Sequence, residues 1–135
     1  ARASHPNFGP AVSLEQYTQF GHIMITTLDA EYGRIDEALA KKGIRRNIQL
    51  RVPHYSAALS ATAQTDLIYT MPRILAPHAQ QAFGLQVSEL PFEAPLRKIF
   101  QVWHKTRTKE FGHQWLRSVV SEAANKAGIR LDKLS

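Results

Sequence analysis

The stretch Gln49–Arg73, QLRVPHYSAALSATAQTDLIYTMPR, decides the fold. Its first four residues, Gln49–Val52, favour a β-strand that stops at Pro53, because proline has no N–H for a sheet and holds the preceding residue extended. The alanine-rich run Ala57–Gln64 predicts a helix, since Ala is the best helix former. Ser56 is placed where a helix cap is preferred. A strand, a turn and a helix are therefore expected in quick succession.

A second strand is expected directly after this helix. The stretch Asp66–Thr70, DLIYT, is predicted to be this strand, and it is closed by Pro72. Two strands joined by a helix form a βαβ unit, which predicts a parallel sheet with helices on its faces. Ligands of such sheets bind beyond the carboxyl ends of the strands. Here those ends are Pro53–Ser56 and Thr70–Pro72, which we expect to share one rim.

Further elements are expected on both sides of this stretch. Ser13 and Gln16 have the spacing of a capping box, so a helix should begin at residue 13 and end at Gly21. Gly84 should end a helix that starts at Arg73. Residues 46–52 alternate between apolar and polar side chains, which predicts a strand with one wetter side near a sheet edge. The remaining expectations are helices over 32–42 and 110–126 and strands over 22–26, 85–90 and 96–104.

The composition narrows the class of protein. With 135 residues, 44% of them hydrophobic, the chain is one domain or a piece of one. It has no Cys, which excludes disulfides and suits the cytoplasm. No apolar run reaches the roughly 20 residues that span a bilayer, so no membrane partner is expected. The net charge of +6 permits an anionic partner, but basic pairs such as Arg45-Arg46 are scattered and are interpreted as solvated surface.

Motifs along almost the whole chain resemble one known family. Seven stretches carry the resemblance, and their order and spacing make it specific: HP (5–6), SLEQYTQFGHIMIT (13–26), GRIDEALAKKG (33–43), IRRNIQLRVPHYSAA (44–58), QTDLIYTMPRILA (64–76), FGLQVSELPFEAP (83–95) and VWHKTRTKEFGHQWLRSVV (102–120). The chain resembles the C-terminal effector-binding part of LysR-type transcriptional regulators, in the branch of the nodulation and salicylate regulators.

The resemblance implies a fold and a domain organisation. The fold would be an open, mostly parallel α/β sheet of the flavodoxin-like or periplasmic-binding-protein type II kind, with flanking helices. Residues 1–12 would be a crossover remnant, 13–92 the second α/β subdomain, and 93–135 a return strand and C-terminal helix. The family's DNA-binding winged helix-turn-helix and most of its first subdomain have no counterpart here, so we expect a fragment that meets DNA only through a domain outside it.

The resemblance also implies a binding wall. In this family the inducer, often a small aromatic acid, lies between the two subdomains, against the strand ends. The corresponding candidates are Thr26, Thr27, Pro53, His54, Tyr55, Ser56, Thr70 and Met71. Free N–H groups at the start of the helix and the Ser56 hydroxyl suit a carboxylate, and Tyr55 and Met71 suit a ring. The alternative is that these residues are only a capped helix start, with Tyr55 packed in the core. Whether the fragment alone binds the inducer also stays open.

Other conspicuous side chains have plainer interpretations. His22 opens a strand and is expected to be a hydrogen-bonded structural histidine. His104 and His113 lack the spacing of metal ligands, so no metal is expected. Trp103 and Trp115 are expected in the core, where large rings hold a helix in place.

The sequence gives little support to catalysis. It contains no G-x-S-x-G elbow, no P-loop and no G-x-G-x-x-G, so neither an enzyme nor a cofactor is expected. Asp36 and Glu37 are interpreted as helix-surface carboxylates. A ligand-sensing module that forms homodimers is the favoured function. A basic nucleic-acid-binding protein is the alternative, and steep salt dependence of binding to random DNA would identify it.

Overall fold

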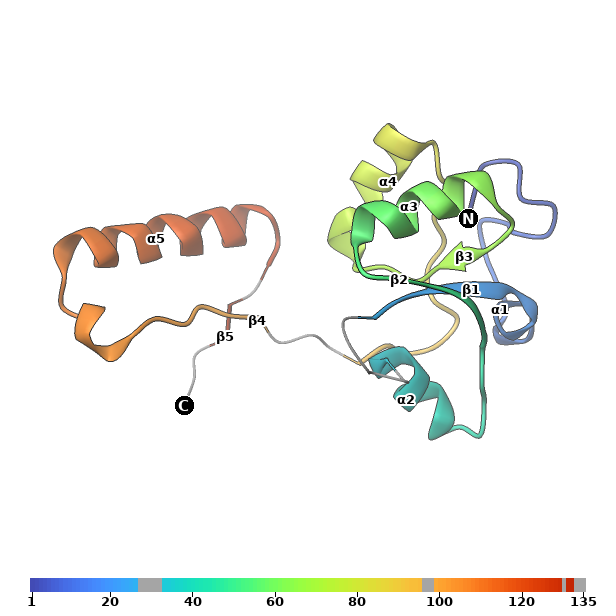
Figure 1. The fold of residues 1–135 in the computed structure, drawn as a ribbon, viewed down its shortest axis with the longest axis horizontal. Coiled ribbons are helices and arrows are strands. Elements are labelled where there is room, and N and C mark those ends of the chain that lie inside the picture. Colours follow the sequence, from blue (N-terminus) through green and yellow to red (C-terminus); the bar gives the residue numbers. More distant parts are fainter. Residues whose placement is uncertain (27–32, 96–98, 130, 133–135) are drawn as a thin grey trace. The chain divides into compact units, whose positions relative to one another are not determined.

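A parallel sheet with helices on both faces forms the first part of the chain (Figure 1). The computed structural model describes residues 1–26, 33–95, 99–129 and 131–132. These fall into two units, Ala1–Pro95 and Leu96–Ser135. The expected α/β class and parallel sheet are thus confirmed.

Three strands build the sheet of the first unit. They are β1 (Gly21–Ile25), β2 (Asn47–Val52) and β3 (Ile68–Tyr69). The described strands lie in the order β2-β1-β3, and both neighbours run parallel to β1. The predicted βαβ unit therefore exists, with β1 inserted between its two strands. β2 lies at an edge of the described sheet, as the alternation of apolar and polar residues predicted, and its residues alternate between exposed and half-buried.

Helices cover both faces of this sheet. The described helices of the unit are α1 (Leu14–Gln19), α2 (Arg34–Ala40), α3 (Tyr55–Gln64), the 3-10 turn η1 (Arg73–Leu75) and α4 (Ala76–Phe83). Figure 1 shows α3 and α4 on one side of the sheet and α2 on the other. One core cluster centres on Tyr17, Leu39 and Ile68, and a second on Leu59 and Ala79. Parallel strands are buried between two apolar layers in just this way.

Local signals explain where these helices begin and end. Ser13 caps α1, and its hydroxyl accepts from the Gln16 N–H at 3.1 Å while the Gln16 side chain accepts from the Ser13 N–H at 2.9 Å. The predicted capping box is confirmed. Gly84 ends α4 with φ +61°, a left-handed conformation that glycine adopts without the steric cost of a Cβ.

Three boundary predictions were wrong. The cap of α3 is His54, whose extended backbone follows from the turn at Pro53, so the helix begins one residue before Ser56. Gly21 does not end α1 but opens β1, where it pairs with Asn47. Residues 85–90 do not form a strand, because only Leu85 has a ladder partner, in an antiparallel bridge to Arg2.

The second unit contains one long helix and short strands. Its described elements are β4 (Ile99–Phe100), the 3-10 turn η2 (Lys105–Arg107), α5 (Phe111–Lys126) and β5 (Leu131–Asp132). β4 and β5 pair in parallel. The predicted strand over 96–104 is thus much shorter in its described part, and residues 96–98 lie outside the described residues. No described helix is both long and apolar enough to cross a bilayer.

The tryptophans of the second unit do not lie in a core. Trp115 is 67% exposed and Trp103 39% exposed, so the prediction of buried rings was wrong. Trp103 is instead covered on one face by Arg117, whose guanidinium carbon is 4.5 Å from the ring centroid. Its indole N–H donates to the Thr108 hydroxyl at 3.2 Å. A single helix over a short two-stranded ribbon offers too little partner surface to bury both rings.

Candidate functional site

The carboxyl ends of the three parallel strands bring most predicted site residues to one edge of the sheet. Thr26 follows β1, Pro53 follows β2 and Thr70 follows β3. The Thr26 N–H donates to the Val52 carbonyl at 3.1 Å, so the first two ends are joined directly. Residues 53–56 and 70–72 therefore share the rim that the sequence predicted. Thr27 lies outside the described residues.

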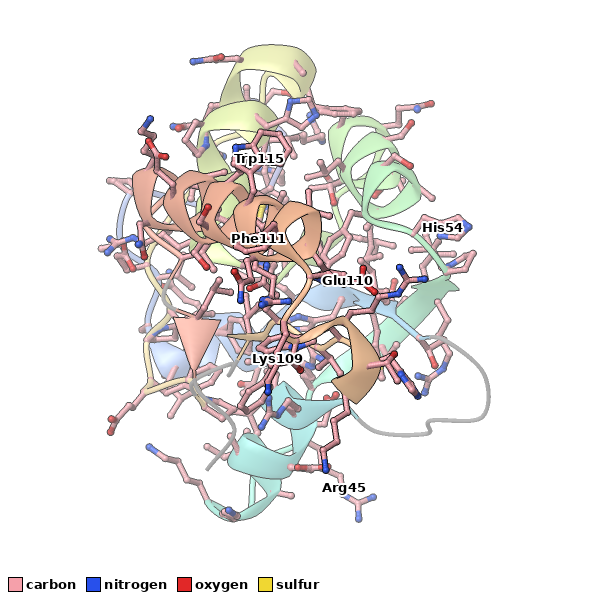
Figure 2. All side chains as sticks on the ribbon, turned by 90° about the vertical axis from the view of Figure 1, so that its left-hand side faces the viewer. Arg45, His54, Lys109, Glu110, Phe111 and Trp115 are labelled. Atoms are coloured by element: carbon pink, nitrogen blue, oxygen red, sulfur yellow. The ribbon has the colours of Figure 1, made fainter. Side chains whose placement is uncertain are left out.

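The amino end of α3 forms part of this edge. His54 and Tyr55 are exposed, as is Ser56 in the first turn of the helix. Figure 2 shows the His54 side chain at the junction of β2 and α3, projecting away from the ribbon. The first N–H groups of a helix have no intrahelical acceptor and carry partial positive charge. This arrangement can hold an anion next to an exposed aromatic ring.

The residues that follow β3 are less exposed to solvent than those that follow β2. Met71 is half-buried and packs against the cluster of Leu59, Ala79 and Leu85. Thr70 is half-buried too, and its hydroxyl lies 2.8 Å from the Tyr17 hydroxyl. The Thr70 hydroxyl is thus bound to a buried side chain, and Met71 packs on the core.

A buried polar network of Tyr17, Arg46 and Asp36 lies next to Thr70. Arg46 pairs with Asp36 through two hydrogen bonds, Nε to Oδ1 at 2.6 Å and Nη2 to Oδ2 at 2.9 Å. Burial alone would raise the pKa of the Asp36 carboxyl, but the hydrogen bonds and charge of Arg46 outweigh it and hold the pKa below its ordinary value. Burial raises the pKa of Tyr17, and the neighbouring Arg46 opposes that shift. At neutral pH the network therefore holds one ion pair and one neutral phenol.

This network corrects two interpretations of the sequence. Asp36 is not a surface carboxylate, since its side chain is 10% exposed, and Arg46 is not solvated surface, since its side chain is 4% exposed. Neither residue nor Tyr17 was predicted to support the site. The ten-residue separation of Asp36 and Arg46 crosses the turn between α2 and β2, so no local pattern links them. A basic residue directly before an edge strand was the only available signal.

His22 also lies in this buried region of the first unit. It is fully buried, and its Nε2–H donates to the Tyr17 carbonyl at 2.8 Å. Among the described residues its Nδ1 has no hydrogen-bond partner. Burial lowers the pKa of His22 to about 4, because an imidazolium would place a charge and an unpaired donor in the core. The prediction of a structural histidine is confirmed for Nε2, but because Nδ1 has no described partner, the ring is not fully hydrogen-bonded as expected.

A hollow lies between α2 and β2. It has a volume of about 640 Å³ and is lined by residues of both elements: Asp36, Glu37, Ala40, Ile44, Arg45, Arg46, Ile48 and Arg51. Its charged groups are of both signs, and two of them neutralise each other in the buried ion pair. Outside that pair, Arg45, Arg51 and Glu37 leave the hollow with a net positive charge. No group of three His, Asp or Glu side chains in the described part of the chain could hold a metal ion.

Comparison with known proteins identifies the relatives of this chain. Residues 1–125 match the family model of the LysR substrate binding domain. The chain is 32% identical over 126 residues to the HTH-type transcriptional activator NagR of a Ralstonia species, covering 93% of this chain and 42% of NagR. It is 32% identical over 119 residues to the HTH-type transcriptional activator NahR of Pseudomonas putida, covering 88% of this chain and 40% of NahR.

A solved structure agrees with this relationship. The regulatory domain of MexT, a transcriptional activator in Pseudomonas aeruginosa, superposes with a TM-score of 0.69 at 27% identity, covering 82% of this chain and 56% of that domain. The chain spans less than half the length of the curated relatives it matches. The chain therefore belongs to the LysR substrate-binding domain family and corresponds to the C-terminal effector-binding domain of these regulators.

Proposed function

We propose that this chain senses a small aromatic carboxylate for a LysR-type transcriptional regulator. The observation that carries the proposal is the shared rim, where the amino end of α3 meets the ends of β1 and β3. The N–H groups and the Ser56 hydroxyl would hold the carboxylate. Tyr55 would lie against the ring of the ligand. The residues that form the wall would be Thr26, Thr27, Pro53, His54, Tyr55, Ser56, Thr70 and Met71.

The proposal extends to the whole regulator. A regulator rather than an enzyme is supported by the relatives, which are named as transcriptional activators. DNA would be bound by a helix-turn-helix outside the sequence of this chain, and the regulator would work as a homo-oligomer in the cytoplasm. A direct role of this chain in binding nucleic acid is not favoured, because its family membership already accounts for the sequence.

Titration of the isotope-labelled chain with salicylate tests the proposal. We expect a dissociation constant in the millimolar range, as is common for weak small-molecule sensing. The amide signals of Thr26, His54–Ser56 and Thr70 should shift, while those of α5 should stay in place. A chimera in which residues 1–125 replace the matching segment of NagR provides a second assay, with a reporter gene as the readout.

Substitutions at the rim sharpen this test. The double variant His54→Ala, Tyr55→Ala should weaken salicylate binding and blunt induction in the chimera. Its matched control is Gln80→Ala, Gln81→Ala, which changes two exposed residues of α4 in the same unit. Salicylate that binds to neither the chain nor the chimera, or binding that is equal in the two double variants, would refute the proposed site.

A further inference from the structure

The hollow between α2 and β2 combines apolar walls with cationic side chains. Its volume of about 640 Å³ lies within the roughly 300–1,000 Å³ that is usual for small-molecule sites. Ile44 and Ile48, both half-buried, supply most of the apolar lining, and Ala40 adds a methyl group. A hydrocarbon body that enters the hollow is removed from water by these side chains, which favours binding.

Two arginines of this hollow, Arg45 and Arg51, are exposed and form no ion pair with a carboxylate of the described residues. Arg51 donates from Nη1 to the sulfur of the buried Met24 at 3.1 Å, and a thioether is only a weak acceptor. A guanidinium has five N–H donors and can bind a carboxylate through two parallel hydrogen bonds. Both arginines therefore have donors left for an anion.

The other charges of the hollow determine which side suits an anion. Asp36 and Arg46 bind each other through two hydrogen bonds, so this pair adds no net charge. Glu37, the remaining acidic residue of the described lining, belongs to α2. Arg51 belongs to β2, and Arg45 lies shortly before that strand. An anion is therefore attracted to the β2 side and repelled by Glu37 on the α2 side.

We propose that the hollow between α2 and β2 is a second binding site, separate from the rim, for a small carboxylate with an aliphatic body. Arg45 and Arg51 bind the carboxylate, and Ile44 and Ile48 contact the body. The described lining contains no aromatic ring, in contrast to Tyr55 at the rim, so its apolar contacts are aliphatic. The inference goes beyond the proposed function and does not depend on it, because it uses none of the rim residues.

Titration of the isotope-labelled chain with cyclohexanecarboxylate tests the inference. The amide signals of Ile44, Ile48 and Arg51 should shift and saturate, with a dissociation constant in the millimolar range. Cyclohexanecarboxamide has the same ring without the charge, and acetate has the charge without the ring. Each should bind to the hollow about 10-fold more weakly or less. Equal binding of the acid and the amide would overturn the inference.

Substitutions identify the groups that bind the carboxylate. The double variant Arg45→Gln, Arg51→Gln should bind cyclohexanecarboxylate about 10-fold more weakly, whereas Glu37→Gln should bind it about 2–3-fold more tightly. The matched control is Lys41→Gln, Lys42→Gln, which removes two exposed cations near the end of α2 that do not line the hollow. An equal loss in the two double variants, or no gain in Glu37→Gln, would overturn the inference.

The two sites of the chain can fail separately, because different amides report on them. If cyclohexanecarboxylate leaves the signals of the hollow unchanged while salicylate shifts those of the rim, the second site is refuted and the proposed function stands. If salicylate binds to neither the chain nor the NagR chimera while cyclohexanecarboxylate shifts the signals of the hollow, the proposed function fails alone.

Discussion

Arg46 and Asp36 form a two-pronged ion pair in the interior between α2 and β2. The two nitrogen–oxygen distances are 2.6 and 2.9 Å, and the Asp36 carboxylate also accepts from the Gly33 N–H at 3.0 Å. Each carboxylate oxygen is therefore satisfied, as a buried charge requires. The pair fastens the start of α2 to the residue that precedes β2, so it stabilises the register of the edge strand.

Removing one member of this pair should be costly. We expect Asp36→Ala to destabilise the first unit by about 3–5 kcal/mol, because Arg46 would keep a buried charge without a partner. Hydrogen exchange of the β1 amides measures this loss within the unit. The control is Glu89→Ala, which breaks the exposed pair with Arg73 and should cost less than about 1 kcal/mol. Similar losses in both variants would contradict a stabilising buried pair.

His22 makes the first unit sensitive to mild acid. Its pKa is about 4 in the folded chain and about 6.5 when unfolded, so the unfolded state takes up the proton first as the pH falls. The contribution of His22 to stability is therefore constant above pH ~6.5, falls as the pH drops from there to ~4, and changes no further below that. The total loss should be about 3 kcal/mol, at 1.36 kcal/mol for each unit of pKa.

Denaturant unfolding between pH 7 and pH 4 measures this dependence. The His22→Gln variant should lose most of the slope over that interval, since glutamine does not titrate. His54→Gln is the control, because it replaces an exposed histidine of the same unit and leaves His22 in place. A slope that survives in His22→Gln would show that another group is responsible.

The sequence predicted those features that depend on local patterns. Residues close together in the sequence were enough to predict the alanine-rich α3, the capping box at Ser13, the glycine at the end of α4 and the parallel strands. The common rim of Pro53 and Thr70 followed from the same rule, because carboxyl ends of parallel strands lie at one edge.

The features that the sequence did not predict depend on contacts between distant residues. Tyr17 meets Thr70 across 53 positions, and the burial of Asp36 and Arg46 requires α2 to pack on the sheet. Their charges alone favoured a solvated surface. The exposed rings on α5 were missed for the opposite reason, since an apolar stripe indicates what a helix can bury and not whether a partner is present.

Gly84 and Gly112 should respond to alanine in opposite directions. Gly84 has φ +61°, where a Cβ is strained, so Gly84→Ala should destabilise the first unit by about 1–2 kcal/mol. Gly112 lies inside the first turn of α5 with open space around it, so Gly112→Ala should stabilise that helix by about 0.5–1 kcal/mol. Hydrogen exchange of α4 and α5 amides reports each effect separately. A loss of the same size in both variants would exclude backbone conformation as the cause.

The apolar stripe of α5 should make the chain self-associate. Phe111 is 87% exposed and Trp115 is 67% exposed, four residues apart on the same side of the helix. Figure 2 shows both side chains projecting from the helix ribbon. Exposed rings of this size usually find another protein surface, because their burial is worth about 25 cal/mol per Å². Sedimentation at increasing concentration should therefore show a rising average mass for the unaltered chain.

Replacing both rings should abolish this association. The double variant Phe111→Ser, Trp115→Ser should stay monomeric at the same concentrations, because the contact loses its largest apolar side chains. Asn125→Ser changes an exposed polar residue of the same helix, and this control should associate as the unaltered chain does. A chain that is monomeric throughout would refute the predicted association. A double variant that associates equally well would place the contact elsewhere. The hollow between α2 and β2 would then be the next surface to alter, starting with its exposed Arg45.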